Sequence, residues 1–364
     1  MRAAVLTATG MPIELWDVNS MPLGPTEARV RVSATGVCRS DHHRVTGAIP
    51  IPLPVILGHE ACGTVVEVGQ LVRGLKPGDR VVSTPNPECG RCWYCVNGQP
   101  NLCVTIGDVR SRPAARSSEG RVIGSLAGLG SFREEMNVDE TMLVKVETSL
   151  PDEQLALLGC AVITGVGAAL NTAEVTVGST VAIIGCGGVG LACVQGCRIA
   201  AAGRILAIDP VESKRRAALA LGATDAIDPS SEDVVAAVRA ASNGRGADFA
   251  FEVVGSAATI LLARQMTRRG GSTVLVGAAA LEETVTFSAW DLHTEGRIIG
   301  CSNGSAHVRR DIPRLIQLAE SGVLDLRALV TERGGLEDLD TAFAAMERGD
   351  SIRTVIFPGL RAAS

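Results

Sequence analysis

Residues 181–190 read VAIIGCGGVG, four apolar residues that lead directly into a glycine-rich segment. A continuous apolar run of this length is typical of a parallel strand that is buried on both faces. We expect a helix over 191–202 and a second apolar strand over 205–208, which ends at Asp209. A G-x-G-x-x-G turn between a strand and a helix is typical of a βαβ unit that binds a dinucleotide.

The glycines of this turn have different expected roles. Gly185 permits the tight turn, Gly187 permits close approach of a pyrophosphate, and Gly190 permits close packing of helix on strand. Gly188 and Val189 begin the helix whose N-terminus faces the phosphates. A bare G-x-G-x-x-G motif is a weak signal, and its context of strand and helix strengthens it.

An acidic residue closes the second strand of this unit. Asp209 can accept hydrogen bonds from both ribose hydroxyls and would repel a 2′-phosphate, so NAD is favoured over NADP. Lys214 is a candidate for a further ribose or phosphate contact, with an ordinary solvated helix lysine as the alternative.

The alternation of helix and strand continues beyond this unit. We expect helices over 215–221, 231–241 and 260–268, and strands over 226–228, 249–253, 273–276 and 297–300. This order predicts an α/β domain with a doubly wound parallel sheet and helices on both faces. Helices over 312–321 and 339–348 and a strand over 355–357 follow, and we expect this tail to pack on the N-terminal part of the chain.

The N-terminal part has a different pattern. Short alternating strands over 3–6, 28–34, 62–68 and 79–82 are separated by glycine and proline turns, which predicts a β-rich, barrel-like domain. The polar stretch 104–127 is expected to be a long surface loop, and 151–171 a helix.

Metal-binding side chains gather between residues 38 and 60, which read CRSDHH at 38–43 and GHE at 58–60. A catalytic zinc takes three protein ligands and keeps one position open. Cys38 and His59 would supply two ligands, and Cys160, in an apolar helical run, is a candidate for the third. The alternatives are a buried thiol at each cysteine and ordinary surface histidines.

A second group of thiols has the spacing C-x2-C-x2-C-x7-C, which supplies four thiolates on one loop: Cys89, Cys92, Cys95 and Cys103. Four thiolates close a tetrahedral zinc site without an open position, so its role would be structural. Four unrelated thiols and an iron–sulfur cluster are the alternatives, and nothing else in the sequence suggests electron transfer.

The composition limits the classes of protein to which this chain can belong. The chain has 364 residues, 46% hydrophobic and 20% charged, with a net charge of −5. These values predict two globular domains or one large one, and no nucleic-acid partner. The N-terminus lacks the apolar core of a signal peptide, and no run reaches membrane-spanning length. We therefore expect a cytoplasmic protein without a membrane partner, whose eleven cysteines are metal ligands or buried thiols rather than disulfides.

The order of these segments resembles that of the zinc-dependent alcohol dehydrogenases of the medium-chain dehydrogenase/reductase superfamily over nearly the whole chain. Two further segments contribute to the resemblance, Leu158-Gly159-Cys160 and Ser351-Ile352-Arg353. The resemblance implies a GroES-like catalytic domain over 1–161 with 303–364, and a Rossmann NAD-binding domain over 162–302. It also implies two zinc ions per chain. The catalytic zinc would be held by Cys38, His59 and Cys160, and the structural zinc by the four-cysteine group.

The resemblance also implies roles for other residues. Asp41 would orient His59, and Glu60 would lie close to the metal. Ser40 and His43 would relay the alcohol proton to solvent while hydride passes to NAD⁺. The pyrophosphate would be held by Arg39 and Arg353.

The substrate is the least determined part. Ser40 is smaller than the threonine that many members of the family have at this position. Pro85 takes a place where many members have an aromatic side chain lining the pocket. Ile49 is apolar, whereas the glutathione-dependent formaldehyde dehydrogenases resemble one another in having an acid at this position. We expect a roomy apolar pocket for bulky or aromatic primary alcohols and aldehydes.

Several alternatives to this substrate remain. They are a thiol-conjugate formaldehyde dehydrogenase, a biosynthetic carbonyl or imine reductase, a nicotinoprotein that retains its cofactor, and a non-catalytic NAD-binding relative. The direction of the reaction stays open. The resemblance favours an oligomer, and the long 104–127 stretch favours a homodimer over a tetramer.

Overall fold

The computed structural model describes residues 1–360 and divides into two compact units. The first comprises Met1–Cys160, His307–Gly322 and the chain from Leu329 onward, and the second comprises Ala161–Ala306 with Val323–Ala328. Residues 361–364, part of the range expected for the catalytic domain, lie outside the described residues.

The short return of the chain to the second unit at 323–328 was not expected. The segment is bonded to Gln195, whose side-chain amide donates to Asp325 O at 3.0 Å and whose side-chain carbonyl accepts from Asp325 N at 2.7 Å. Two hydrogen bonds from one buried glutamine thus fix this segment to a helix of the second unit.

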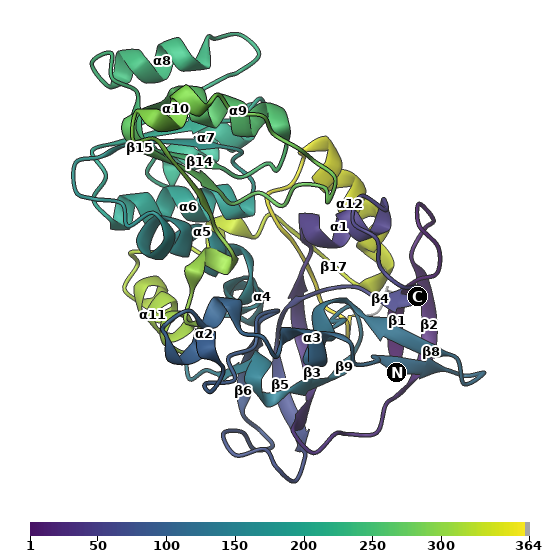
Figure 1. The fold of residues 1–364 in the computed structure, drawn as a ribbon. Coiled ribbons are helices and arrows are strands. Elements are labelled where there is room, and N and C mark those ends of the chain that lie inside the picture. The colour runs from purple at the N-terminus through teal and green to yellow at the C-terminus, as the bar shows by residue number, and fades with distance from the viewer. Residues whose placement is uncertain (361–364) are drawn as a thin grey trace. The chain divides into compact units, whose positions relative to one another are not determined.

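The first unit is rich in strands. A closed barrel runs in the order β1 (Arg2–Leu6), β2 (Glu14–Ser20), β7 (Ala115–Ser117), β8 (Val122–Ser125) and β4 (Val55–Ile56) (Figure 1). A seven-stranded sheet runs in the order β10 (Leu143–Lys145), β6 (Arg80–Ser83), β5 (Glu60–Val68), β3 (Glu27–Gly36), β18 (Thr354–Ile356) and β17 (Glu332–Gly334), and β9 (Glu135–Asp139) also pairs with β3. Apolar side chains on alternate positions of these strands form the core.

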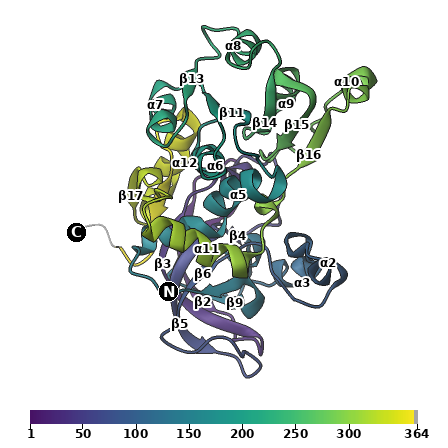
Figure 2. The ribbon, with the colours of Figure 1, turned by 90° about the vertical axis from the view of Figure 1, so that its left-hand side faces the viewer.

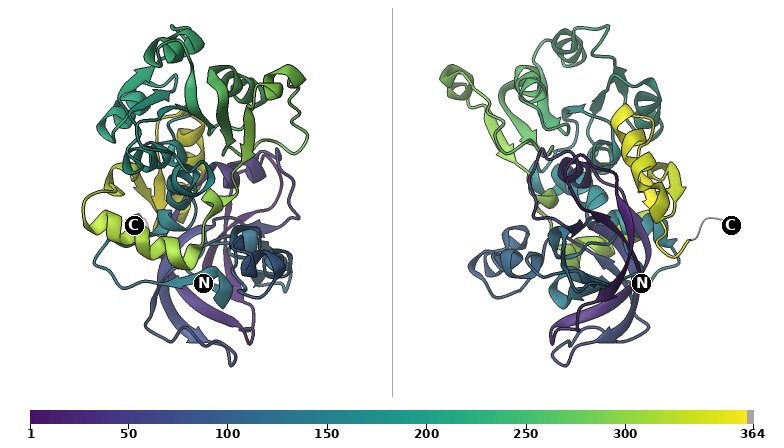
Figure 3. Two further views of the ribbon diagram at one scale, coloured as in Figure 1. Left: turned by 60° about the vertical axis from the view of Figure 1, so that its left-hand side comes forward. Right: turned by 90° about the vertical axis from the view of Figure 1, so that its right-hand side faces the viewer.

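The helices of the first unit are mostly short. They are α1 (Arg39–Val45), α2 (Trp93–Val96), α3 (Ile106–Arg110), α4 (Asp152–Ala156), α11 (Val308–Glu320) and α12 (Leu339–Arg348). In Figures 2 and 3 the segment around α2 and α3, in blue, stands out from the strands of this unit as a small lobe.

Two expectations for this unit were wrong. Residues 104–127 are not a surface loop, because they contain α3 and the barrel strands β7 and β8, whose Ala115 and Ile123 are fully buried. The stretch 151–171 is not one helix: α4 passes into a single turn at Leu157–Gly159, the backbone leaves helical geometry at Cys160, and α5 (Ala161–Gly167) follows.

The second unit is a six-stranded parallel sheet in the order β13 (Asp225–Ile227), β12 (Arg204–Ile208), β11 (Thr180–Ile184), β14 (Ala247–Glu252), β15 (Thr267–Leu275) and β16 (Arg297–Gly300). Figure 2 shows β13, β11, β14, β15 and β16 in this order from left to right. The order reverses direction between β11 and β14, which is the arrangement of the doubly wound dinucleotide-binding fold.

Helices cover both faces of this sheet, because right-handed crossovers before and after the reversal lie on opposite sides. They are α6 (Gly188–Ile199), α7 (Glu212–Ala220), α8 (Val234–Ala241), α9 (Ala257–Met266) and α10 (Ala289–His293). Helix α6 packs on α5, and α8 packs on α9. The expected α/β fold class, a GroES-like β-rich part with a Rossmann-type part, is confirmed.

Single helical turns complete the chain. They lie at Pro100–Leu102, Leu126–Gly128, Glu140–Met142, Leu157–Gly159, Asn303–Ser305, Arg327–Leu329 and Leu336–Asp338, with a π-helical segment at Ala168–Thr172. Within residues 1–360, no single helix has the length and apolar composition to cross a membrane, and only one bent pair of helices, Asp152–Gly159 with Ala161–Thr172, meets those criteria jointly.

Candidate active site

Helix α1 and the turn before β5 are joined by one buried carboxylate. Asp41 Oδ2 accepts from Cys38 N at 3.0 Å, and Oδ1 accepts from Gly58 N at 2.8 Å. The same Oδ1 lies 3.1 Å from His59 Nδ1. Asp41 therefore caps the helix that begins after Cys38 and also orients the imidazole ring of His59.

The turn that presents His59 requires glycine. Gly58 has φ +91°, and a Cβ there would lie 2.5 Å from Ser131 Oγ and 2.8 Å from Phe132 N. Only glycine reaches this backbone geometry without strain, and only glycine leaves the space. The Gly58-His59-Glu60 segment is thus shaped to turn two ionisable side chains inward.

Four side chains converge beyond this turn. The ligand atoms of Cys38, His59, Glu60 and Cys160 all lie within 4.8 Å of one another, and Cys160 Sγ lies 3.5 Å from His59 Nε2. The break in the helix at Cys160, with φ −137° and ψ −75°, frees its thiol to join this group. The structure therefore brings together the three residues proposed as catalytic-zinc ligands and Glu60.

The buried ionisable groups here shift one another's pKa: that of Cys38 is lowered, whereas a hydrogen bond to Cys38, together with burial, raises the pKa of Cys160. A hydrogen bond from the Cys160 thiol lowers the pKa of Cys38 well below its usual range. Burial alone would lower the pKa of His59, but the Asp41 carboxylate raises it well above its usual value. Two thiols, an imidazole and a carboxylate at this spacing are a donor set that suits zinc.

Glu60, the fourth member of this group, is fully buried. Its Oε1 is 3.4 Å from Arg353 Nη2, and Arg353 Nη1 donates to Val37 O at 2.7 Å. Burial raises the pKa of Glu60 to about 8, against the opposing charge of Arg353. Among the described residues no hydrogen bond reaches either Glu60 oxygen, so this carboxylate remains available to a cation beside it.

Ser40 and His43 share one face of α1, since they are three residues apart in the helix. His43 Nε2 is buried and has no hydrogen-bond partner among the described residues. Burial, and then the charge of Arg39, lower the pKa of His43. The adjacent His42 instead contacts Phe343 and lies 4.0 Å from Glu347 Oε2, so it is a packing residue outside this group.

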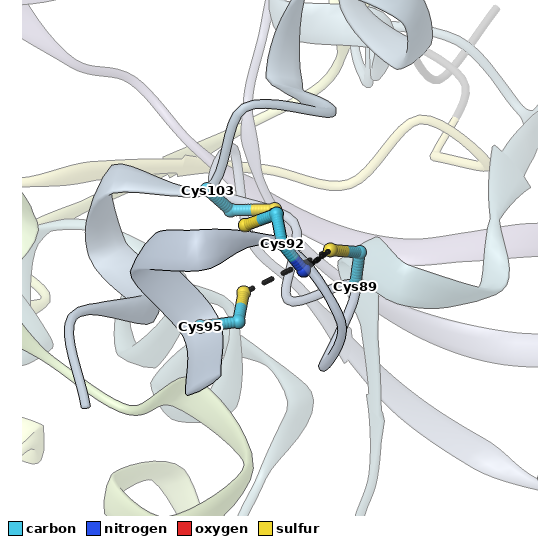
Figure 4. A group of neighbouring side chains, drawn as sticks. All are labelled: Cys89, Cys92, Cys95 and Cys103. Carbon is cyan, nitrogen blue, oxygen red and sulfur yellow. Dashed lines mark hydrogen bonds between the residues drawn. The ribbon is translucent and has the colours of Figure 1, made fainter. Parts of the chain in front are cut away.

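The four-cysteine group forms the small lobe beside α2. The sulfur atoms all lie within 4.8 Å of one another, with Cys89 to Cys95 and Cys92 to Cys103 at 3.9 Å each (Figure 4). Tetrahedral zinc with Zn–S bonds of about 2.3 Å requires sulfurs about 3.8 Å apart. Amides of Cys95 and Val104 also lower the pKa of Cys92 to about 6, which favours its thiolate. These residues fit a structural zinc.

The expected dinucleotide site lies in the second unit. Gly185 has φ +93°, and a Cβ on Gly190 would collide with Gly185 O, so both positions require glycine. A Cβ on Gly187 would meet nothing within 4 Å, which leaves an open surface at the start of α6.

Both Asp209 oxygens are already held by the backbone of this turn. Oδ2 accepts from Cys186 N and Oδ1 from Val211 N, each at 2.8 Å. Lys214 lies in α7, which begins shortly after Asp209. Arg39 and Arg353, the other expected cofactor contacts, belong to the first unit.

The two expected substrate-pocket residues have defined places in the first unit. Ile49 N donates to His43 O at 3.0 Å, so Ile49 follows the end of α1 closely. Pro85 is buried, and its carbonyl accepts from Arg110.

Comparisons with known proteins agree with this geometry. Residues 24–148 match the family model of the alcohol dehydrogenase GroES-like domain, and residues 188–321 match that of the zinc-binding dehydrogenases. The chain is 39% identical to an S-(hydroxymethyl)glutathione dehydrogenase of Photobacterium damsela subsp. piscicida, over 98% of this chain and 99% of that protein.

Solved structures are similar over the same length. An alcohol dehydrogenase zinc-binding domain protein from Burkholderia ambifaria has a TM-score of 0.92 at 33% identity, and the benzyl alcohol dehydrogenase from Acinetobacter calcoaceticus has 0.91 at 31%. Each alignment covers 98% of both chains. The chain belongs to the zinc-dependent alcohol dehydrogenases of the medium-chain dehydrogenase/reductase superfamily and is an oxidoreductase.

Proposed function

We propose that this enzyme transfers hydride between NAD(H) and an alcohol or aldehyde at a zinc ion held by Cys38, His59 and Cys160. The observation that carries the proposal is the convergence of these three side chains and Glu60 within 4.8 Å. The four thiols of the small lobe would hold a second, structural zinc ion.

Zinc, when bound, supplies a Lewis acid that lowers the pKa of an alcohol or polarises a carbonyl. Asp41 holds His59 in the orientation that ligation needs. Ser40 would receive the alcohol proton, and His43, with a buried and unpartnered ring nitrogen, would pass it towards solvent.

In this proposal the dinucleotide binds at the Gly185–Gly190 turn, with its pyrophosphate at the N-terminus of α6 and Asp209 beside its ribose. Gly188 and Val189 would face the phosphates, and Lys214 would add a contact. Arg39 and Arg353 would contribute their positive charges to the pyrophosphate.

The first substrate to test is the adduct of formaldehyde with a low-molecular-weight thiol. The name of the 39% identical relative supports it, since the similarity extends over 98% of the chain. A bulky or aromatic primary alcohol is the second candidate. It is supported by the structural similarity to the benzyl alcohol dehydrogenase and by the apolar Ile49 and Pro85.

NADH formation on a substrate panel separates the two candidates. The panel is formaldehyde with glutathione, formaldehyde alone, benzyl alcohol and ethanol, with zinc content measured on the same sample. Turnover of formaldehyde that requires the thiol identifies the conjugate. NADH formation that needs no thiol and is faster with benzyl alcohol than with ethanol identifies the aromatic alcohol as the substrate. No turnover with two zincs bound, in either direction, would contradict the proposed function.

We further propose that the enzyme is a cytoplasmic homodimer. None of the eleven cysteines, all of which lie within the described residues, forms a disulfide, as in proteins from a reducing compartment. Light scattering after gel filtration should give twice the chain mass of 37.7 kDa, and four times that mass would replace the dimer by a tetramer.

A further inference from the structure

The four-cysteine lobe holds the start of α11 from two points of its loop. Glu88, directly before Cys89, accepts from Val308 N through Oε1 at 2.6 Å. The ring of His307 donates from Nε2 to the carbonyl oxygen of Gly98, between the third and the fourth cysteine, at 3.1 Å. A carboxylate at the N-terminus of a helix satisfies one of its free amides and is favoured by the helix dipole. Two polar contacts therefore join the lobe to α11, which lies beside α2 in Figure 1.

The same helix packs on the turn that leads to Cys160. Helix α11 contacts the single turn Leu157–Gly159 and strand β10. Ile312 of α11 is buried, and so are all three residues of this turn. The backbone leaves helical geometry at Cys160, immediately after the turn. The position of α11 therefore bears on the position of the Cys160 thiol.

A second connection reaches this turn through the segment between β6 and the lobe. A Cβ on Gly159 would lie 3.0 Å from Ser83 C and 3.6 Å from Thr84 Cα, so the two backbones leave no space for a side chain. The backbone at 83–84 thus packs directly on the residue before Cys160. Glu88 follows four residues after Thr84, at the entry to the lobe. Glu88 consequently belongs to both connections between the lobe and the turn.

The lobe supplies the change of state that coupling between two sites requires. No residue of α2 is buried, and Trp93 and Val96 are exposed, so the lobe has little apolar packing of its own. We expect it to be ordered when its four thiols hold a metal and to unfold without one. An ordered lobe presents Glu88 and Gly98 to α11 at fixed positions, and an unfolded lobe releases both contacts.

We propose that Glu88 and His307 are positioning residues that couple the two metal groups, so that metal in the four-cysteine lobe strengthens zinc binding by Cys38, His59 and Cys160. Both residues act through α11 rather than on a metal ion. The proposal rests on the proposed function, because it needs a zinc ion at the catalytic group. Coupling between two binding sites typically changes affinity by about 5- to 150-fold. For two hydrogen bonds we expect a change of about 10-fold, in the lower part of this range.

The first experiment measures the affinity of the catalytic zinc by competition with a chromogenic chelator. The full chain is loaded with zinc, and the chelator is kept at concentrations at which Cys160→Ser retains the zinc of the lobe. Under these conditions the wild type gives up only its catalytic zinc. In Cys95→Ser, which cannot complete the lobe site, we expect the affinity of the catalytic zinc to be about 10-fold lower than in the wild type.

Variants of the two contacts keep every proposed zinc ligand, so they carry the test even where Cys95→Ser does not fold. Glu88→Ala and His307→Ala should each lower the affinity of the catalytic zinc by about 3- to 10-fold, the effect of one hydrogen bond. Glu88→Gln should keep most of the affinity, because its amide oxygen still accepts from Val308 N. The matched control is Glu320→Ala at the opposite end of α11, where Glu320 Oε1 accepts from Thr148 Oγ1 at 2.5 Å. This control should keep the wild-type affinity.

A double variant shows whether the contacts act through the lobe. Once the lobe is empty, Glu88 has no ordered element to connect to α11. Cys95→Ser combined with Glu88→Ala should therefore bind the catalytic zinc as tightly as Cys95→Ser alone, since the two changes interrupt one connection. A loss equal to the product of the two single fold-changes would overturn the coupling, because Glu88 would then act without the lobe.

The remaining outcomes separate this inference from the proposed function. Equal affinity of the catalytic zinc in the wild type, Glu88→Ala and His307→Ala would overturn the coupling and leave the proposed function intact. An equal loss in Glu320→Ala and Glu88→Ala would also overturn it, because the affinity would then follow the stability of α11 alone. A wild-type protein that holds zinc in the lobe and none at the catalytic group would contradict the proposed function itself.

Discussion

His43 is the residue whose protonation should appear in the pH profile. Burial, followed by the charges of Arg39 and His42, holds its pKa below the usual 6.5. The neutral ring is the form that accepts a proton, so alcohol oxidation should fall only as the pH drops through this lowered pKa. We expect the acid limb of the kcat profile below pH 6.5.

The variant His43→Gln tests this assignment. It should remove the acid limb and slow oxidation near neutral pH by about 10²-fold, the usual contribution of a positioned base. Steady-state rates between pH 5 and 9 measure both effects. A limb that stays in place in His43→Gln would assign the titration to another group.

Replacing Asp41 should weaken the binding of the catalytic metal without removing any of its ligands. Its carboxylate holds Cys38 N, Gly58 N and His59 Nδ1. Partners of this kind typically account for 10- to 100-fold in metal affinity, so we expect a loss of about that size in Asp41→Asn. Competition with a chromogenic chelator measures it. Asp108→Asn, on the exposed side of α3, is the control, and equal affinity in both variants would contradict the role of Asp41.

The sequence predicted some of these residues and not others, for physical reasons. Cys38 and His59 could be paired from their residue types, since few side chains bind zinc and both lie within 23 residues. Cys160 could be joined to them only through the family resemblance, because nothing in an apolar helical run shows that the helix breaks there.

At the scale of an element, the turn before β5 can be tested against an equivalent turn elsewhere. Gly58 and Gly78 have nearly equal φ values, +91° and +92°, but a Cβ on Gly78 meets nothing within 4 Å whereas one on Gly58 meets Ser131 and Phe132. Each alanine variant should lose about 1–3 kcal/mol of its free energy of unfolding through backbone strain. Gly58→Ala should lose more of this free energy because of the steric contacts, and should also lose the zinc bound beside His59.

Chemical denaturation and zinc analysis of the two variants measure this difference. Equal stability and full zinc occupancy in both would mean that the turn at Gly58 adapts to a side chain without moving His59.

The glycine-rich turn offers a second matched pair. Gly190→Ala places a methyl group against Gly185 O, so we expect a destabilised second unit. Gly187→Ala meets no protein atom, so folding should be preserved while the Kd for NAD⁺ rises, because the open space is where the pyrophosphate would approach. Thermal unfolding with and without NAD⁺ separates the two effects. A wild-type Kd in Gly187→Ala would contradict the proposed cofactor position.

Elements were predicted best where the pattern was continuous. The apolar runs of β11 and β12 indicated buried parallel strands, and the structure has both. The prediction of a surface loop over 104–127 was wrong because β7 has only three residues and β8 four, and each places exposed or half-buried residues beside the buried ones. Polar residues therefore dominate the composition even though the two strands belong to the closed barrel.

At the scale of the whole molecule, the two metal groups should contribute to different properties. Leu155, Leu157 and Leu158, which precede Cys160 in the chain, are fully buried, so we expect the fold around the catalytic group to persist without a metal. The four-cysteine lobe is different. No residue of α2 is buried, and Trp93 and Val96 are 66% and 65% exposed. This lobe has little apolar packing of its own, and a metal would have to supply its stability.

Two cysteine variants separate these contributions. We expect two zincs per chain in the wild type and one in each of Cys160→Ser and Cys95→Ser. Cys160→Ser should lose alcohol oxidation but keep the wild-type Tm to within a few degrees, because serine nearly preserves the packing. Cys95→Ser should unfold the lobe, lower the Tm and expose residues 89–103 to proteolysis. A Cys95→Ser protein that keeps two zincs and resists protease would show that the lobe holds its shape without metal, and its four thiols would then need another explanation.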